Sequence, residues 1–150
     1  MKNLIFIFVL CCLSGTMAFA QQIDYNLQST YVADGYDVVS YFSNQAEKGS
    51  SKFTHTHDGV SYKFSSEDNL RKFKENPTDY VPQYGGWCAY AMGSYSDKVT
   101  INPKTFEIRD GKLYLFYNAY FTNTLDKWLD EGAEELKIKA DKSWESSKFK

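Results

Sequence analysis

The dipeptide Asp58-Gly59 constrains the fold of this chain more strongly than any other local feature. Ring-bearing side chains alternate with threonine in Phe53-Thr54-His55-Thr56-His57, and a second alternating segment, Val60-Ser61-Tyr62-Lys63-Phe64, follows the dipeptide. Asp-Gly between two alternating segments is the pattern of a two-residue β-hairpin turn. We therefore predict paired strands over 53–57 and 60–64, with both histidines on one face of the first strand.

Further patterns predict a second hairpin and several short helices. Asp110-Gly111-Lys112 separates strand-like segments at 105–109 and 113–117. Ser65 and Ser66 are good N-cap residues for a helix that Asn76-Pro77 ends. Residues 36–42 are β-branched and aromatic, which predicts a short strand. Residues 87–92 are predicted as a short helix that Gly93 ends.

The C-terminal third is predicted to be helical. Leu125, Trp128 and Leu129 share one helical face, and a second stripe follows at spacings of three or four, made by Ala133, Leu136, Ala140 and Trp144. We expect this stripe to pack on the sheet. The sequence therefore predicts a small single α+β domain, in which antiparallel hairpins pack with several short helices.

Residues 1–20 have the pattern of a secretory signal peptide. Lys2 precedes an apolar run from Leu4 to Leu13, and Ala18-Phe19-Ala20 resembles a cleavage site. The run of about ten apolar residues is shorter than the roughly 20 that a spanning helix needs. We expect cleavage after Ala20, a periplasmic or secreted protein, and no stable membrane insertion afterwards. An N-terminal arm over 21–33, a domain over 34–146 and a tail over 147–150 would remain.

The charge of the chain argues against nucleic acid as a partner. The formal net charge is −2, and removal of Lys2 with the signal makes it one unit more negative. The lysines are spread along the sequence and form no basic run. A small ligand or a metal ion is the partner we expect, and the sequence does not indicate an oligomeric state.

Cys88 would be alone after cleavage, because Cys11 and Cys12 lie in the signal. A single cysteine in an exported protein suggests a reactive thiol or an intermolecular bond. A thiol at the start of a helix would have a favoured thiolate form. The alternative is a buried, inert side chain, which is common for free cysteine.

His55 and His57 form a candidate metal pair, because side chains two apart on a strand project to the same side. Imidazoles suit copper, zinc or nickel, but a closed zinc site takes four ligands. Cys88 could complete the site if the fold brought it to the hairpin. The alternative is two exposed or partly packed histidines beside a turn.

A candidate small-ligand pocket follows from the aromatic side chains, which make up 17% of the chain. Apolar walls with a few hydroxyl groups are typical of small-ligand sites. The same residues could instead form a packed core. The candidate lining residues are Tyr41, Tyr62, Tyr84, Gly85, Gly86, Trp87 and Tyr114.

Four segments of the sequence resemble the YHS domain family, in the longer form found in exported bacterial proteins. They are DGYDVVSYF (34–42), DGVSYKFSSEDNLRKFKENPTDYVPQYGGWCAYAM (58–92), NPKTFEIRDGKLYLFYN (102–118) and ADKSW (140–144). The resemblance covers roughly residues 34–144. It implies a YHS-like core related to the treble clef, and it does not imply one activity.

Shorter YHS domains, similar to the TRASH metal-binding modules, occur on heavy-metal-transporting ATPases and bind metal through cysteines. By this resemblance, Ser40 falls at one cysteine position, and Ser65 and Asn69 fall at two others. Hydroxyl and amide groups are far poorer ligands for soft metals than thiolates. The short-form metal site therefore does not transfer to this chain, although the sheet and helix that hold it are expected to.

Three functional hypotheses remain open from the sequence. The first is an exported binding module for a transition metal or small molecule near Cys88 and the first hairpin. The second is a thiol-based redox or hydrolytic enzyme that uses Cys88. The third is a non-catalytic interaction protein with a structural cysteine. The sequence favours binding over catalysis, because neither histidine stands in a recognisable triad context.

Overall fold

The fold is built from local hairpins and short helices that are joined by buried aromatic side chains. A computed structural model describes residues 21–149, so the predicted signal peptide and its cleavage site lie outside the described residues. The elements follow in the order η1 (Val32–Gly35), η2 (Ser40–Ser43), β1 (Ser50–His57), β2 (Val60–Phe64), α1 (Glu67–Glu75), α2 (Pro77–Tyr80), η3 (Gln83–Gly86), α3 (Ala89–Tyr95), β3 (Asn102–Arg109), β4 (Lys112–Phe116), β5 (Asn118–Ala119), β6 (Thr122–Asn123), α4 (Thr124–Asp130) and α5 (Ala133–Ser147). This arrangement confirms the α+β class, with antiparallel hairpins and several short helices.

Both predicted hairpins are present. β1 pairs antiparallel with β2 through His57 opposite Val60, and β3 pairs with β4 through Arg109 opposite Lys112. The two turn residues between each pair have positive φ, at 50° and 76° for Asp58-Gly59 and 51° and 68° for Asp110-Gly111. A turn with positive φ at both residues matches the right-handed twist of the paired strands, and Asp-Gly adopts this conformation readily.

The helix after the first hairpin also begins and ends as predicted. The Ser66 side chain accepts a hydrogen bond from the Asn69 backbone N–H and caps α1. α1 ends before Asn76, and Pro77 opens α2. Phe73 is fully buried and brings α1 against the aromatic face of the hairpin.

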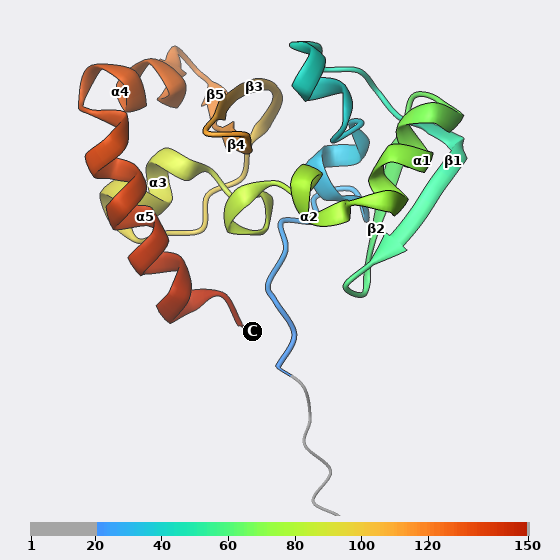
Figure 1. Cartoon of the computed structure of the whole chain (residues 1–150). Coiled ribbons are helices and arrows are strands. Elements are labelled where there is room, and N and C mark those ends of the chain that lie inside the picture. Colours follow the sequence, from blue (N-terminus) through green and yellow to red (C-terminus); the bar gives the residue numbers. More distant parts are fainter. Residues whose placement is uncertain (1–20, 150) are drawn as a thin grey trace, which may run out of the picture.

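The buried residues form two clusters, which correspond to the two sides of Figure 1. The first cluster contains the inner face of β1–β2, α1 and part of the N-terminal segment. The second contains α3, α4 and α5 with the end of β4, and Trp128 is its largest fully buried side chain. The β3–β4 hairpin contributes to both clusters, since Leu113 belongs to the first and Phe116 to the second.

The strand predicted over 36–42 is wrong. This segment makes a turn and then the 3-10 helix η2, which ends at Asn44 in the left-handed region. The reason is Asp37, whose side chain accepts hydrogen bonds from the backbone of Val39 and Ser40 and closes a turn. Such a local bond competes with strand formation despite the β-branched sequence.

The C-terminal helices differ in part from the prediction. α5 carries the predicted stripe, with Ala133, Leu136 and Ala140 buried, but it packs closely on α3. Leu129 is about half exposed, so it does not share the buried face with Trp128. α3 runs through Gly93 to Tyr95, and Gly93 lies against the Leu136 backbone of α5, where a side chain would not fit.

The two ends of the described chain pack into the fold. Ile23 forms a β-bridge with Phe149, and Tyr25 and Asn26 are buried. In Figure 1 the N-terminal segment passes between the two sides of the molecule and meets the end of α5. None of the helices in residues 21–149 combines the length and the apolar character needed to cross a membrane.

Candidate functional site

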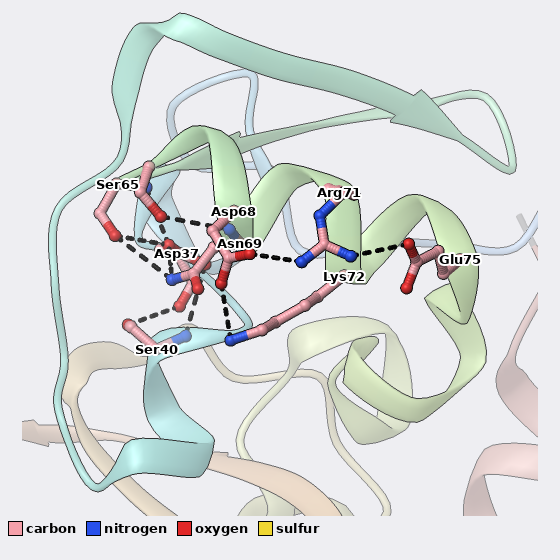
Figure 2. A network of polar contacts seen from close by, with 9 residues as sticks. Asp37, Ser40, Ser65, Asp68, Asn69, Arg71, Lys72 and Glu75 are labelled. Carbon is pink, nitrogen blue, oxygen red and sulfur yellow. Dashed lines mark hydrogen bonds and ion pairs between the residues drawn. The ribbon is translucent and has the colours of Figure 1, made fainter.

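The carboxylate of Asp37 is a fully buried polar centre that joins three segments of the chain (Figure 2). Oδ1 accepts hydrogen bonds from the backbone N–H groups of Val39 at 2.9 Å and Ser40 at 3.4 Å. Oδ2 accepts from the Ser65 N–H at 2.8 Å, the Ser65 hydroxyl at 2.7 Å and the Asn69 side-chain amide at 2.7 Å. A buried carboxylate is costly unless donors satisfy it, and these five bonds do so.

Three of the donors come from the positions that the family resemblance aligns with metal-binding cysteines. Ser40, Ser65 and Asn69 all donate to Asp37. The hydroxyl of Ser40 also bridges the loop, donating to the carbonyls of Asp37 and Gln45. Ser65 and Asn69 thus reach the Asp37 carboxylate with their side chains, whereas Ser40 reaches it only through its backbone N–H.

This donor set does not fit a soft transition metal. The groups around Asp37 are hydroxyl and N–H donors whose hydrogens point at the carboxylate, and none of them is a thiolate or imidazole. Sequence reasoning missed Asp37, although aspartate favours turns because its side chain can accept from the backbone N–H two residues on, as it does from Val39.

The segment before Asp37 forms one wall of a groove with a volume of about 580 Å³. This volume lies within the range of about 300–1,000 Å³ that is usual for small-molecule sites. The groove is lined by Ser29, Tyr31, Asp34, Gly35, Tyr36, Lys48, Gly49, Lys63, Asn102, Pro103 and Lys104. Its residues come from η1 and the segments on either side of it, the loop into β1, β2 and the start of β3.

Three lysines and one aspartate give the groove a positive balance. Within residues 21–149, Lys48, Lys63 and Lys104 form no ion pair with a carboxylate. The Lys63 ammonium lies 4.2 Å from the centre of the Tyr31 ring, a cation–π contact. Groups of this kind favour a ligand that carries negative charge.

The groove wall is held in an unusual backbone conformation. Ala33, Asp34 and Gly35 have φ values of 52°, 55° and 77°, so two non-glycine residues in succession are left-handed. The Gly49 N–H donates to the Gly35 carbonyl at 2.9 Å. A Cβ on Gly49 would lie 2.4 Å from Lys63 Cβ, so only glycine fits there. Conformations of this kind persist where the surrounding structure fixes them.

Cys88 is fully buried and serves as a hydrogen-bonded thiol. Its sulfur accepts from the Tyr117 N–H at 3.4 Å and lies 3.3 Å from Thr124 Oγ1. The Thr124 hydroxyl already donates to the Tyr117 carbonyl, so the thiol donates to Thr124. Cys88 is the N-cap residue of α3 and does not lie within its first turn.

The structure does not bring His55 and His57 to Cys88. Both imidazoles pack edge-on against Phe73, with ring centres 6.1 and 5.9 Å away, in the first cluster, whereas Cys88 belongs to the second. No group of three or more His, Cys, Asp and Glu side chains suited to a metal occurs in residues 21–149. Partial burial lowers the pKa of His55, and the charges of Lys74 and His57 lower it further.

The residues of the predicted tyrosine pocket are divided between the two clusters. Tyr41 and Tyr62 lie in the first, and Tyr84 and Tyr114 lie in the second. Burial raises the pKa of all four phenols. Tyr41 alone touches the groove wall, donating its hydroxyl to the Pro103 carbonyl at 2.7 Å.

Gly85, Gly86 and Trp87 pack on the N-terminal segment. A Cβ on Gly85 would lie 2.9 Å from the Asp24 carbonyl oxygen, and the Gly86 carbonyl accepts from the Asn26 side chain. The Trp87 indole N–H donates to the Asp24 carbonyl at 2.8 Å. Gly85 and Gly86 therefore permit a close approach of the N-terminal segment, and this segment occupies the space that a ligand would need.

Comparison of the chain with protein-family models, with curated proteins and with solved structures gives no significant match.

Proposed function

We propose that this chain is an exported, non-catalytic binding module related to YHS domains, and that it holds a small organic anion in the lysine groove. The observation that carries the proposal is the meeting of Lys48, Lys63 and Lys104 in one groove without a carboxylate partner in the described chain. Three lysines against one aspartate leave the groove lining with a net positive charge, which a bound anion would neutralise.

Some lysines outside the groove have acidic partners. Lys98, Lys137 and Lys148 each lie within ion-pair distance of an acidic side chain. Within the described chain Lys112 and several other exposed lysines are unpaired as well, so what distinguishes the groove is that three lysines line one hollow with Asp34 as the only acid among its lining residues. A ligand with a carboxylate or phosphate group, and a hydroxyl or amine toward Asp34, matches this pattern.

The Asp37 centre supports the proposal through rigidity. It fixes the loop that carries Tyr36 and Lys48, because Asp37 N–H donates to the Glu47 carbonyl while its side chain is bound to Ser65 and Asn69. Preorganised walls lower the entropy that binding must overcome. The centre would then take the structural place that a metal holds in the shorter domains, with the groove as the binding site.

The alternatives based on Cys88 find less support in the geometry. The thiol is fully buried, donates to Thr124, and lies in a different cluster from both histidines. A catalytic thiol needs access and a nearby cation or base. A metal site would need ligands that these residues do not bring together.

Thermal unfolding of residues 21–150 against a panel of small carboxylates and phosphate esters tests the proposal at low ionic strength. A ligand should raise Tm in a saturable way, and calorimetry should then give its Kd. Lys63→Met and Lys104→Met should each weaken Kd about tenfold, as expected for a charge-assisted contact. Lys112→Met, an exposed lysine on β4 outside the groove, is the matched control and should leave Kd unchanged.

Two results would overturn the proposal. One is a panel in which no compound raises Tm, or in which binding is indifferent to the groove lysines. The other is near-stoichiometric transition metal in protein purified without chelator, lost in the His55→Ala/His57→Ala variant, because that would restore the metal interpretation.

A further inference from the structure

The tip of the third hairpin carries the two most exposed large apolar side chains of the described chain. Tyr120 is 90% exposed and Phe121 is fully exposed, and they form the two-residue turn between β5 and β6. Their φ values of 49° and 65° place both residues in the left-handed region. Bulky residues rarely adopt this conformation, and here neither side chain gains contacts within the fold.

The other two hairpins show what this turn requires. Asp58-Gly59 and Asp110-Gly111 have nearly the same φ values, and both use the dipeptide that suits the geometry. The third hairpin makes the same turn with the least suitable residue types. Local turn chemistry and core packing therefore give no reason for Tyr120 and Phe121, which points to a contact outside the chain.

The base of this hairpin is held firmly. The Asn118 amide donates to the Thr105 hydroxyl at 3.1 Å, and the Thr124 hydroxyl donates to the Tyr117 carbonyl at 2.8 Å. The buried Cys88 sulfur contacts both Tyr117 and Thr124, the residues that flank the hairpin. The two aromatic side chains are thus presented on a fixed support, and their exposure does not result from a loose loop.

We propose that the Tyr120–Phe121 tip inserts into the interface of a lipid bilayer. Two aromatic side chains bury about 150–250 Å² each, well below the roughly 1,000 Å² that a stable protein interface needs. A bilayer needs no complementary surface and accepts a shallow apolar projection. Tyrosine and phenylalanine suit the boundary between headgroups and acyl chains.

The charge of the region fits a contact driven by apolar burial. No residue from Leu113 to Leu125 is charged, so the hairpin itself carries no ionised group into the interface. The chain carries a net negative charge, which gives no general attraction to anionic lipid. Binding should therefore be weak, reversible and insensitive to salt, because a single apolar anchor gives marginal affinity.

Co-sedimentation of residues 21–150 with vesicles tests this proposal. The vesicles would be phosphatidylcholine alone and a phosphatidylcholine–phosphatidylglycerol mixture, at low and high salt. The wild type should bind both, and Tyr120→Asp/Phe121→Gly should lower the partition coefficient at least tenfold. Ile138→Asp, which removes another exposed apolar side chain on α5, is the matched control and should bind like the wild type.

A probe at the tip separates insertion from other effects. Cys88 is buried, so a cysteine introduced as Thr122→Cys can be labelled selectively with an environment-sensitive dye. Its emission should rise and shift to the blue with vesicles. The Tyr120→Asp/Phe121→Gly variant should also melt a few degrees higher than the wild type, and this result would show that its loss of binding is not a loss of folding.

Several outcomes would overturn the proposal. One is equal vesicle binding by the wild type and the tip variant, and another is no binding to either kind of vesicle. A third is binding to the anionic vesicles alone, if the groove lysine variants abolish it. A change from dimer to monomer in the tip variant, measured by light scattering without vesicle binding, would assign the tip to self-association. The comparison of the wild type with the tip variant on phosphatidylcholine vesicles does not depend on whether the lysine groove binds an anion.

Discussion

Asp37 shows how one side chain can organise a region of the fold. Its two oxygens accept from residues 39 and 40 on one side and from residues 65 and 69 on the other, so loop, hairpin and helix meet at a single carboxylate. The neighbouring charges of α1 lie outside this centre, where Arg71 pairs with Asp68 and Glu75 on the exposed surface (Figure 2). Exposed pairs contribute little to stability, whereas the buried carboxylate and its donors depend on one another.

Asp37→Asn should lower the free energy of unfolding by about 3 kcal/mol, because an amide NH₂ would face N–H and hydroxyl donors. Chemical denaturation followed by circular dichroism measures this change. Asp34→Asn, an exposed aspartate three residues earlier, is the control and should change stability by less than about 0.5 kcal/mol. Equal stability of the Asp37 variant and the wild type would show that the centre is not structural.

Among the elements, the contact between α3 and α5 depends on a single glycine. A Cβ on Gly93 would lie 2.5 Å from the Leu136 carbonyl oxygen, and this neighbour is backbone that cannot rotate away. The short helix α3 is therefore placed by packing, and its own helix propensity is secondary. This contact explains why Gly93 lies inside α3, although the sequence predicted that the helix would end there.

Gly93→Ala should destabilise the protein by about 1–3 kcal/mol through overpacking, although alanine is the better helix former. Ser94→Ala on the same helix is the matched control and should be neutral or slightly stabilising. Both are measured by thermal unfolding of residues 21–150. A stabilised Gly93→Ala variant would mean that α3 and α5 can separate to admit a methyl group.

On the scale of the whole molecule, the two clusters are joined by more than the β3–β4 hairpin. The Asn26 N–H donates to the Gly85 carbonyl, and the Trp87 indole donates to the Asp24 carbonyl. The N-terminal segment is thereby bonded to η3 and Trp87, which connect the first cluster to the second. A domain joined in this way is expected to unfold in one cooperative transition.

Cys88 can report on that transition, because its thiol is fully buried. Ellman's reagent should react with the folded protein at least about 10³-fold more slowly than with unfolded chain, at a rate that follows the population of open states. Reaction rates measured across a denaturant series, beside unfolding followed by circular dichroism, provide the comparison. Rapid reaction of the folded protein would reveal local opening around α3 and reopen the case for a functional thiol.

The features that could be predicted from the sequence are those set by interactions between residues close together in the chain. The two Asp-Gly turns, the Ser66 cap and the Asn76-Pro77 stop are local interactions, and each appears where the sequence places it. The resemblance to YHS domains stays a prediction, and Ser65 and Asn69, which it aligned with cysteine positions, both donate to Asp37.

The groove and the role of Cys88 were decided only by the tertiary structure. Lys48, Lys63 and Lys104 come from three separate segments and have no spacing that would relate them. Residues 36–42 have the composition of a strand, but the donors that hold Asp37 in a turn include residues about 30 positions away. Local patterns describe forces between neighbours along the chain, whereas a site depends on contacts that exist only after distant segments have packed together.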